Sequence, residues 1–248
     1  MIVGIMQPYF FPYLGYFQLM AACDVFVLHD DVQYIKGGWV NRNRILRNGG
    51  ASWLTMPVCQ DASHLPINRR FYQLEQPIVA RLLRRLEAAY RRAIRFDAIF
   101  PFIAELLAFG APNVALFNAN LLQQIALRLG IGTQLVSSSA LDKTANLTGV
   151  DRVLDICRRL GATRYVNPIG GTRLYAAERF AADGVTLRFL QPELPDYPQF
   201  GQPFVANLSI IDALMFNDDL VLDRLMGSYR LMPAGSAGAG GHASGPPR

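Results

Sequence analysis

Short apolar runs alternate with helix-like segments along the chain, and this pattern predicts a parallel β-sheet. Residues 2–6 (IVGIM) and 24–28 (DVFVL) are continuous apolar runs typical of fully buried strands. LGYFQLMAACD (14–24) lies between them with helical spacing, which completes a strand–helix–strand unit. The second half repeats this logic, with strand-like GTQLVSS, ATRYVNPIGG and VTLRFL alternating with helix-like GVDRVLDICRRLG and LYAAERFAADG.

The middle of the chain departs from this alternation and predicts an insertion. RNRILRNGGASWLTMPV (42–58) has two strand-like runs around Asn48-Gly49-Gly50, a turn signal for a β-hairpin. An amphipathic helix is predicted over 75–94, and two more helices around 97–109 and 113–129. The arginines of the first helix fall off its apolar stripe and suit either phosphate or plain solvent. The predicted fold is α/β, a parallel sheet with flanking helices plus a β-hairpin and helical insertion.

Length and composition indicate one globular domain followed by a tail. The 248 residues are enough to bury a substantial core, and half of them are apolar. We find no internal repeat and no linker, so residues 1–232 are interpreted as a single domain. Residues 233–248 (PAGSAGAGGHASGPPR) are too small and polar to pack, and they are predicted to be disordered.

Charge and cysteine content narrow the functional classes. The net charge of +5 is a mild surplus that suits anionic ligands such as phosphates but does not require nucleic acid, and we expect no DNA partner. Three widely spaced cysteines and three histidines make a poor disulfide framework and a poor metal site, so no metal site is predicted. The N-terminus lacks a basic region before its apolar run, and no apolar run is long enough to span a bilayer. These features predict a cytoplasmic protein.

The segment that follows the first strand, MQPYFFPYLGYFQLM (6–20), is the first candidate site. Its prolines stiffen the loop, its glycine permits close backbone approach, and the following helix N-terminus suits an anion. The alternative is that its aromatic rings only fill the space between sheet and helix. The residues we expect to bind substrate here are Gln7, Tyr9, Tyr13, Gly15 and Tyr16.

This strand–loop–helix arrangement resembles the nucleotidylyltransferases, in which a His-x-Gly-His quartet stands at this point. Here the four positions hold Tyr13-Leu14-Gly15-Tyr16. A neutral tyrosine donates a hydrogen bond but does not become cationic at neutral pH, so it cannot replace an imidazolium beside a phosphoryl group. The resemblance therefore implies a Rossmann-like, nucleotidylyltransferase-like cradle with changed chemistry.

The polar run after the second strand, HDDVQYIKGGWVNRNRI (29–45), is the second candidate site. Because it follows a parallel strand, it should lie at the same edge of the sheet as the opening loop. A solvated loop is the alternative interpretation. The catalytic candidates are His29 or Asp30 as a base and Lys36 on phosphate, and His29 fits a strand-end histidine with a satisfied ring nitrogen equally well. The remaining substrate-binding candidates of this run are Asp31, Gln33, Trp39, Asn41 and Arg42.

Two loops of the second half supply further candidates. YVNPIGGTRLY (165–175) ends a strand with a glycine pair whose backbone N–H groups suit an anion. SSSALDKT (137–144) carries a lysine on a polar loop after another strand. The predicted substrate-binding residues here are Asn167, Gly170, Gly171, Tyr175 and Lys143.

These blocks, together with FVANLSIIDALMFN, resemble the WbqC-like proteins over roughly residues 1–220. That family is associated with bacterial surface polysaccharide (O-antigen) gene clusters, and the resemblance implies a transferase that acts on a nucleotide-linked amino sugar, with glycine as the transferred group. Such a transfer implies an energy source, either ATP with Mg²⁺ or a charged tRNA. The alternatives are a divergent nucleotidylyltransferase and a non-catalytic nucleotide-sugar-binding protein.

Overall fold

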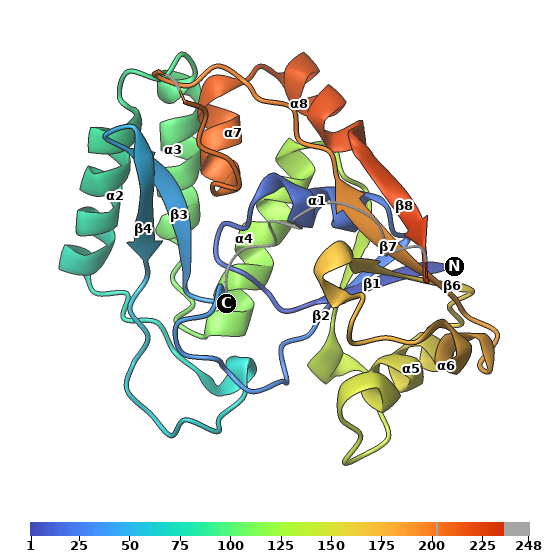
Figure 1. Cartoon of the computed structure of the whole chain (residues 1–248). Helices are drawn as coiled ribbons and strands as arrows, with labels where there is room; N and C mark the ends of the chain where they lie inside the picture. Colours follow the sequence, from blue (N-terminus) through green and yellow to red (C-terminus); the bar gives the residue numbers. More distant parts are fainter. Residues whose placement is uncertain (202, 236–248) are drawn as a thin grey trace.

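A computed structural model describes residues 1–201 and 203–235 and confirms the α/β fold (Figure 1). Its main sheet has six strands in the order β5-β2-β1-β6-β7-β8. Five of them run parallel, and only β8 pairs antiparallel with its neighbour β7. The strands are β1 (Ile2–Met6), β2 (Val25–Leu28), β5 (Gln134–Ser137), β6 (Arg164–Pro168), β7 (Thr186–Pro192) and β8 (Tyr229–Pro233).

Helices cover both faces of this sheet, as expected when strand–helix–strand units build a parallel sheet. Alternate side chains of the inner strands pack on α5 and α6 on one face, in a cluster that includes Val3, Val27 and Phe189. The opposite side chains, among them Phe26 and Val166, join a larger cluster with α1, α4, α7 and α8. The helices are α1 (Leu14–Ala21), α4 (Val114–Arg128), α5 (Gly149–Arg159), α6 (Ala177–Ala181), α7 (Ile210–Phe216) and α8 (Asp219–Gly227).

The predicted insertion forms a separate two-stranded sheet beside two helices, at the left of Figure 1. Strands β3 (Arg42–Arg47) and β4 (Gly50–Thr55) pair antiparallel, with α2 (Gln76–Tyr90) and α3 (Phe96–Leu107) beside them. Asn48 and Gly49 form the turn with φ values of 51° and 74°. Two consecutive left-handed residues are what a tight hairpin turn requires, so the Asn-Gly signal is confirmed.

The C-terminal end of the described chain differs from the prediction in one element. Pro233, which we assigned to the tail, is the last residue of β8, a strand that the apolar pattern did not indicate. Residues 236–248, the rest of the predicted tail, lie outside the described residues. Within the described part of the chain, none of the helices combines the length and the apolarity needed to cross a bilayer.

Candidate functional site

The order of the strands defines where a ligand site is expected. The connection after β1 leads through α1 to β2 on one side, whereas that after β6 leads through α6 to β7 on the other. Such a reversal opens a crevice at the carboxyl ends of the strands, where open α/β sheets bind ligands. Gln7 follows β1 at this point, and Asn167 lies near the end of β6. The carboxyl ends of β2 and β5 lie at the same edge of the sheet.

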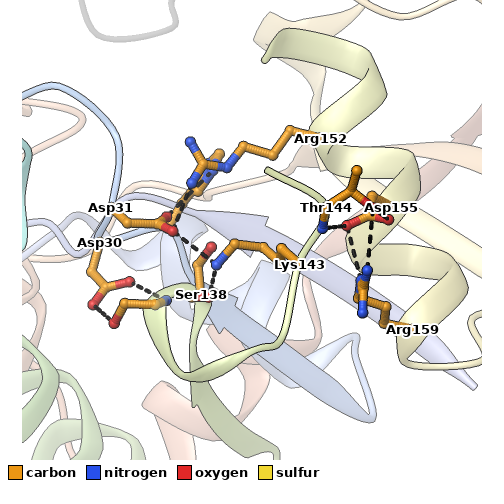
Figure 2. A network of polar contacts seen from close by, with 10 residues as sticks. Asp30, Asp31, Ser138, Lys143, Thr144, Arg152, Asp155 and Arg159 are labelled. Atoms are coloured by element: carbon orange, nitrogen blue, oxygen red, sulfur yellow. Dashed lines mark hydrogen bonds and ion pairs between the residues drawn. The ribbon is translucent and has the colours of Figure 1, made fainter. Parts of the chain in front are cut away.

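Asp31, three residues beyond β2, is the centre of a cluster of charges (Figure 2). Its Oδ2 atom lies 2.8 Å from Lys143 Nζ and 2.6 Å from an Arg152 guanidinium nitrogen. Burial acts to raise the pKa of the Asp31 carboxyl, but the hydrogen bond from Lys143 and the charges of Arg152 and Lys143 outweigh it and lower that pKa. The cluster therefore holds an ionised carboxylate between two cations.

His29 lies beside this carboxylate in its neutral form. Its Nε2 atom is 4.0 Å from Asp31 Oδ1, and both atoms are buried without a hydrogen-bond partner. Burial lowers the pKa of the imidazole to about 4, with the charges of Arg152 and Lys143 acting in the same direction and that of Asp31 opposing them. The backbone N–H of His29 donates to Met6 O at 2.8 Å, which fixes the histidine at the end of β1.

Asp30 points away from Asp31 and performs a different role. Its two carboxylate oxygens accept hydrogen bonds from the backbone N–H of Ser139 at 2.9 Å and from the Ser139 hydroxyl at 2.5 Å. The side chain is 4% exposed. Asp30 therefore ties the end of β2 to the short turn at 138–140 that follows β5, and neither oxygen is free of a partner.

The loop that carries Lys143 is held at its other end by Asp155 of α5. Asp155 accepts hydrogen bonds from the backbone N–H and the hydroxyl of Thr144, each at 3.0 Å, and from Arg159 at 2.9 Å. Its pKa is lowered because these bonds and the Arg159 charge outweigh the opposing effect of burial. Lys143 Nζ also donates to the carbonyl of Ser138. Asp30 and Asp155 thus clamp both ends of the segment 138–144, and its lysine is directed at Asp31 (Figure 2).

The opening loop is fixed through its own backbone carbonyls. Tyr16 donates its hydroxyl to Gln7 O at 2.9 Å, and Asn118 donates to Pro8 O at 2.8 Å. The carbonyls of residues 10, 11 and 12 accept from Asn43, the Ser209 hydroxyl and the Ile210 N–H, respectively. Phe11 has a φ of 42°, a conformation that a bulky residue adopts only where its surroundings enforce it. The loop is therefore a rigid wall.

The tyrosines of this loop divide into two groups. Tyr16 is 2% exposed and lies in the core, whereas Tyr9 and Tyr13 are half-buried at the surface of the loop. Burial raises the pKa of Tyr13 to about 12, with a smaller contribution from Tyr9, so its phenol is a neutral donor. A Cβ atom on Gly15 would lie 2.4 Å from the Tyr13 ring, so this glycine makes room for Tyr13 at the start of α1.

A small hollow joins the two candidate segments. It is lined by Tyr9, Pro12, Tyr13, Trp39, Asn43 and Asn207 and has a volume of about 20 Å³. The tyrosine loop and the polar run after β2 therefore do wall one space. That space holds about one water molecule, so it is too small for a nucleotide or a sugar in this conformation.

The remaining candidates of the polar run lie outside the charged cluster. Asn41 is buried, where it donates to Met56 O at 2.9 Å and accepts from the Tyr34 hydroxyl at 2.8 Å. Gln33 is exposed and donates to Ser63 O. Lys36 is also exposed, and no polar contact joins it to the cluster among the described residues. Trp39 and Arg42 lie at the hairpin.

The segment after β6 packs as a unit of its own. Asn167 accepts a hydrogen bond from the Tyr165 hydroxyl at 3.0 Å, and the Tyr175 ring lies 5.7 Å from the Tyr165 ring. A Cβ atom on Gly171 would lie 1.8 Å from the amide nitrogen of Asn167, so any larger residue would displace that side chain. Gly170 is exposed and has open space around its Cα. Gly171 is therefore packed against Asn167, whereas Gly170 has free space beside it.

Three residues of the cluster were not among the predicted site residues, namely Arg152, Ser139 and Asp155. Arg152 and Asp155 belong to the helix that we interpreted only as amphipathic, and Ser139 lies in the serine run that drew attention for its lysine. For Arg152, the signal that could have found it is an arginine in the first turn of a helix that follows a strand's carboxyl end.

The donor set of this cluster does not fit Mg²⁺. No group of three or more histidine, cysteine, aspartate or glutamate ligands comes together in residues 1–201 and 203–235. Asp30 is occupied by Ser139, and Asp31 is paired with two cations, which would repel a metal ion. We therefore derive no chemical step through a metal.

Comparisons with known proteins agree with the family resemblance. The family model described as the WbqC-like protein family matches residues 7–221. The uncharacterized protein Rv1507c of Mycobacterium tuberculosis is 33% identical over 226 residues, which cover 87% of this chain and 93% of that protein. No solved structure matches the chain significantly.

Proposed function

The chain belongs to the WbqC-like protein family, and we propose that it is a transferase of surface-polysaccharide biosynthesis that moves an aminoacyl group, glycyl in the first instance, onto the amino group of a nucleotide-linked amino sugar. The observation that carries this proposal is the pair of buried, unpartnered acceptors, His29 Nε2 and Asp31 Oδ1. Buried acceptors without partners are rare in folded proteins, and such a pair calls for a ligand with two donor hydrogens.

A primary amine matches the spacing of these two acceptors. They lie 4.0 Å apart, so a nitrogen placed about 2.8 Å from each would see them at an angle of about 90°. With its ring proton on Nδ1, neutral His29 accepts at Nε2, and the carboxylate of Asp31 accepts at Oδ1. A water molecule has the same two donors and would fill the position until the amine displaces it.

The cations around Asp31 suit the anionic part of the same substrate. Lys143 and Arg152 bring two positive charges to a half-buried position where, among the residues that the structure describes, Asp31 is their one carboxylate partner. Charge-assisted hydrogen bonds of this kind are the usual partners of phosphate oxygens. A nucleotide-linked sugar combines a diphosphate with a ring, so one molecule would engage both the cations and the acceptor pair.

The proposed step needs one base and no redox partner. The amine nitrogen attacks the carbonyl carbon of an activated glycyl ester or glycyl phosphate and forms the amide bond. One N–H proton passes to His29 Nε2, and the bond to the leaving oxygen breaks with its electron pair. The negative charge of Asp31 offsets part of the cost of protonating His29, whose pKa is lowered to about 4 by burial and by the charges of Arg152 and Lys143.

The test is a transfer assay with mass-spectrometric detection. The protein is incubated with a nucleotide-linked amino sugar and with either glycyl-tRNA or glycine, ATP and Mg²⁺, and the acceptor is expected to gain one glycyl residue. His29→Gln should lower turnover about 100-fold or more, because general-base catalysis typically contributes 10²–10⁴-fold. Asp142→Asn, a fully exposed carboxylate of the same loop, is the matched control and should leave turnover unchanged.

Two results would overturn the proposal. Exchange of pyrophosphate into ATP without any acyl transfer would identify a nucleotidylyltransferase instead. Binding of the nucleotide sugar without turnover under any donor condition would identify a non-catalytic binding protein.

A further inference from the structure

The outward face of the β3–β4 hairpin carries an alternating stack of tryptophans and arginines. The ring centroids of Trp39 and Trp53 are 5.3 Å apart. The guanidinium of Arg42 lies 4.0 Å from the Trp53 ring centre, and that of Arg44 lies 5.6 Å from the Trp39 ring centre. Arg42 and Arg44 alternate along β3 with the buried Asn43, so both arginines share the outer face.

The positive charge of this face is not neutralised within the protein. No carboxylate of the described residues lies within 4.0 Å of Arg42 or Arg44, whereas the arginines of α5 pair with Asp31, Asp155 and Asp183. Arg85 of α2 lies at the edge of this hairpin, where it donates to the backbone carbonyl of Trp53 at 2.7 Å and to the Ser52 hydroxyl at 3.4 Å. Arg81 lies one turn earlier on the same side of α2 and is exposed.

The shape of the surface separates two kinds of ligand. Sites for small molecules are concave and enclose most of the ligand. This face is instead the open side of a two-stranded sheet, with Trp53 38% exposed, and the adjacent hollow behind Trp39 has only about 20 Å³. Open aromatic platforms flanked by guanidiniums that lack a carboxylate partner are how proteins bind single-stranded nucleic acid, because bases stack on the rings and phosphates contact the cations.

We propose that the hairpin face formed by Trp39, Arg42, Arg44 and Trp53, together with Arg81 and Arg85 of α2, binds single-stranded nucleic acid. Figure 1 shows the strands β3 and β4 of the hairpin beside α2. This binding is independent of the proposed transfer and survives its failure. If both hold, the single-stranded end of a charged tRNA is a ligand that connects them.

The two tryptophans of the chain are both in this surface, which supplies a direct experiment. A 12-nucleotide single-stranded RNA is titrated into the full-length protein while intrinsic tryptophan emission is recorded. Stacked bases are expected to quench the emission. The same titration with UDP and with a duplex of the same sequence distinguishes a mononucleotide site and plain electrostatic attraction from the proposed surface.

Variants of the hairpin test whether RNA binds there, and their RNA affinity is measured by the fluorescence anisotropy of end-labelled RNA. Trp53→Ala should weaken binding roughly tenfold or more, since base stacking on an aromatic ring is a main source of affinity. Arg42→Ala should reduce the slope of log affinity against log salt by about 0.7 for each phosphate that the arginine no longer neutralises. Arg230→Ala on β8, at the opposite side of the molecule in Figure 1, removes the same charge and is the control.

Three results of these titrations would contradict single-strand binding at the hairpin. Equal effects of Arg42→Ala and Arg230→Ala, tighter binding of UDP than of RNA, or quenching by duplex as strong as by single strand would each overturn the proposal. Circular dichroism and the melting temperature verify that Trp53→Ala is folded. If that variant does not fold, Trp53→Phe together with Arg42→Ala carries the test, and full RNA affinity in the double variant would refute the proposal.

Discussion

Replacing Asp30 tests whether this carboxylate is a clamp or a base. Asp30→Ala removes both acceptors of Ser139, whose N–H and hydroxyl donate at 2.9 and 2.5 Å. Hydrogen bonds to charged groups contribute about 1.5–3 kcal/mol each, and part of the two would be recovered when solvent binds the N–H and hydroxyl of the exposed Ser139. We expect a loss of about 3 kcal/mol in the free energy of unfolding, which is a large share of the stability of an ordinary domain.

Asp30→Asn separates the two roles. An asparagine oxygen still accepts from the Ser139 N–H, and its NH₂ group donates to the Ser139 hydroxyl, so the clamp persists with a cost of about 1 kcal/mol. A general base, by contrast, loses its function on this change. Urea unfolding of both variants and of Asp142→Asn, together with turnover, gives the comparison.

If Asp30 acts as a clamp, a double-mutant cycle should show that Asp30 and Ser139 are coupled. Once Asp30 is alanine, Ser139→Ala should cost little additional stability, because the two side chains act on one contact. Stability unchanged in Asp30→Ala, or turnover abolished in a fully stable Asp30→Asn, would refute the reasoning and make Asp30 a catalytic candidate again.

Three other perturbations follow from the same contacts. Asp155→Ala releases the loop of Lys143 and should raise the KM for a phosphate-bearing substrate more than it lowers kcat, as steady-state kinetics would show. The pKa of His29 is lowered to about 4 in the folded protein, against about 6.5 in the unfolded chain. The free energy of unfolding should therefore be highest above pH 6.5 and fall by up to about 3 kcal/mol as the pH falls toward 4. His29→Gln should flatten that part of the stability–pH curve measured by urea unfolding. Gly171→Ala should lower the free energy of unfolding by about 1–3 kcal/mol through overpacking, while Gly170→Ala, with open space around it, should change the melting temperature little.

The sheet was predictable because its inner strands are buried on both faces and therefore read as continuous apolar runs. β1 and β2 have this pattern. β8 has no such signal, because it is an edge strand with three of its five residues exposed (Arg230, Leu231 and Pro233). Its pairing with β7 depends on tertiary contacts that the sequence pattern does not reveal.

The site was predictable in position more than in role. Parallel strands end at one edge, so the run after β2 was expected beside the opening loop, whereas the meeting of His29, Asp31 and Lys143 was not predicted. The direction of each side chain was not accessible in this way. Asp30 and Asp31 are neighbours in sequence, yet successive side chains on extended backbone diverge, so one holds a turn and the other holds two cations.

The opening loop differs from the segment after the second strand in how its polar groups are paired. The backbone carbonyls of residues 8, 10, 11 and 12 each accept a hydrogen bond from a distant segment, and Tyr16 is packed in the core. A loop whose polar groups are satisfied internally can shape a wall but offers few groups to a substrate. His29 and Asp31 retain unpartnered atoms in a buried setting, and the proposed transfer rests on these atoms and not on the opening loop. The loss of imidazoles at the first strand is therefore compatible with catalysis, provided that the chemistry depends on a base beside β2 and not on charge at the start of α1.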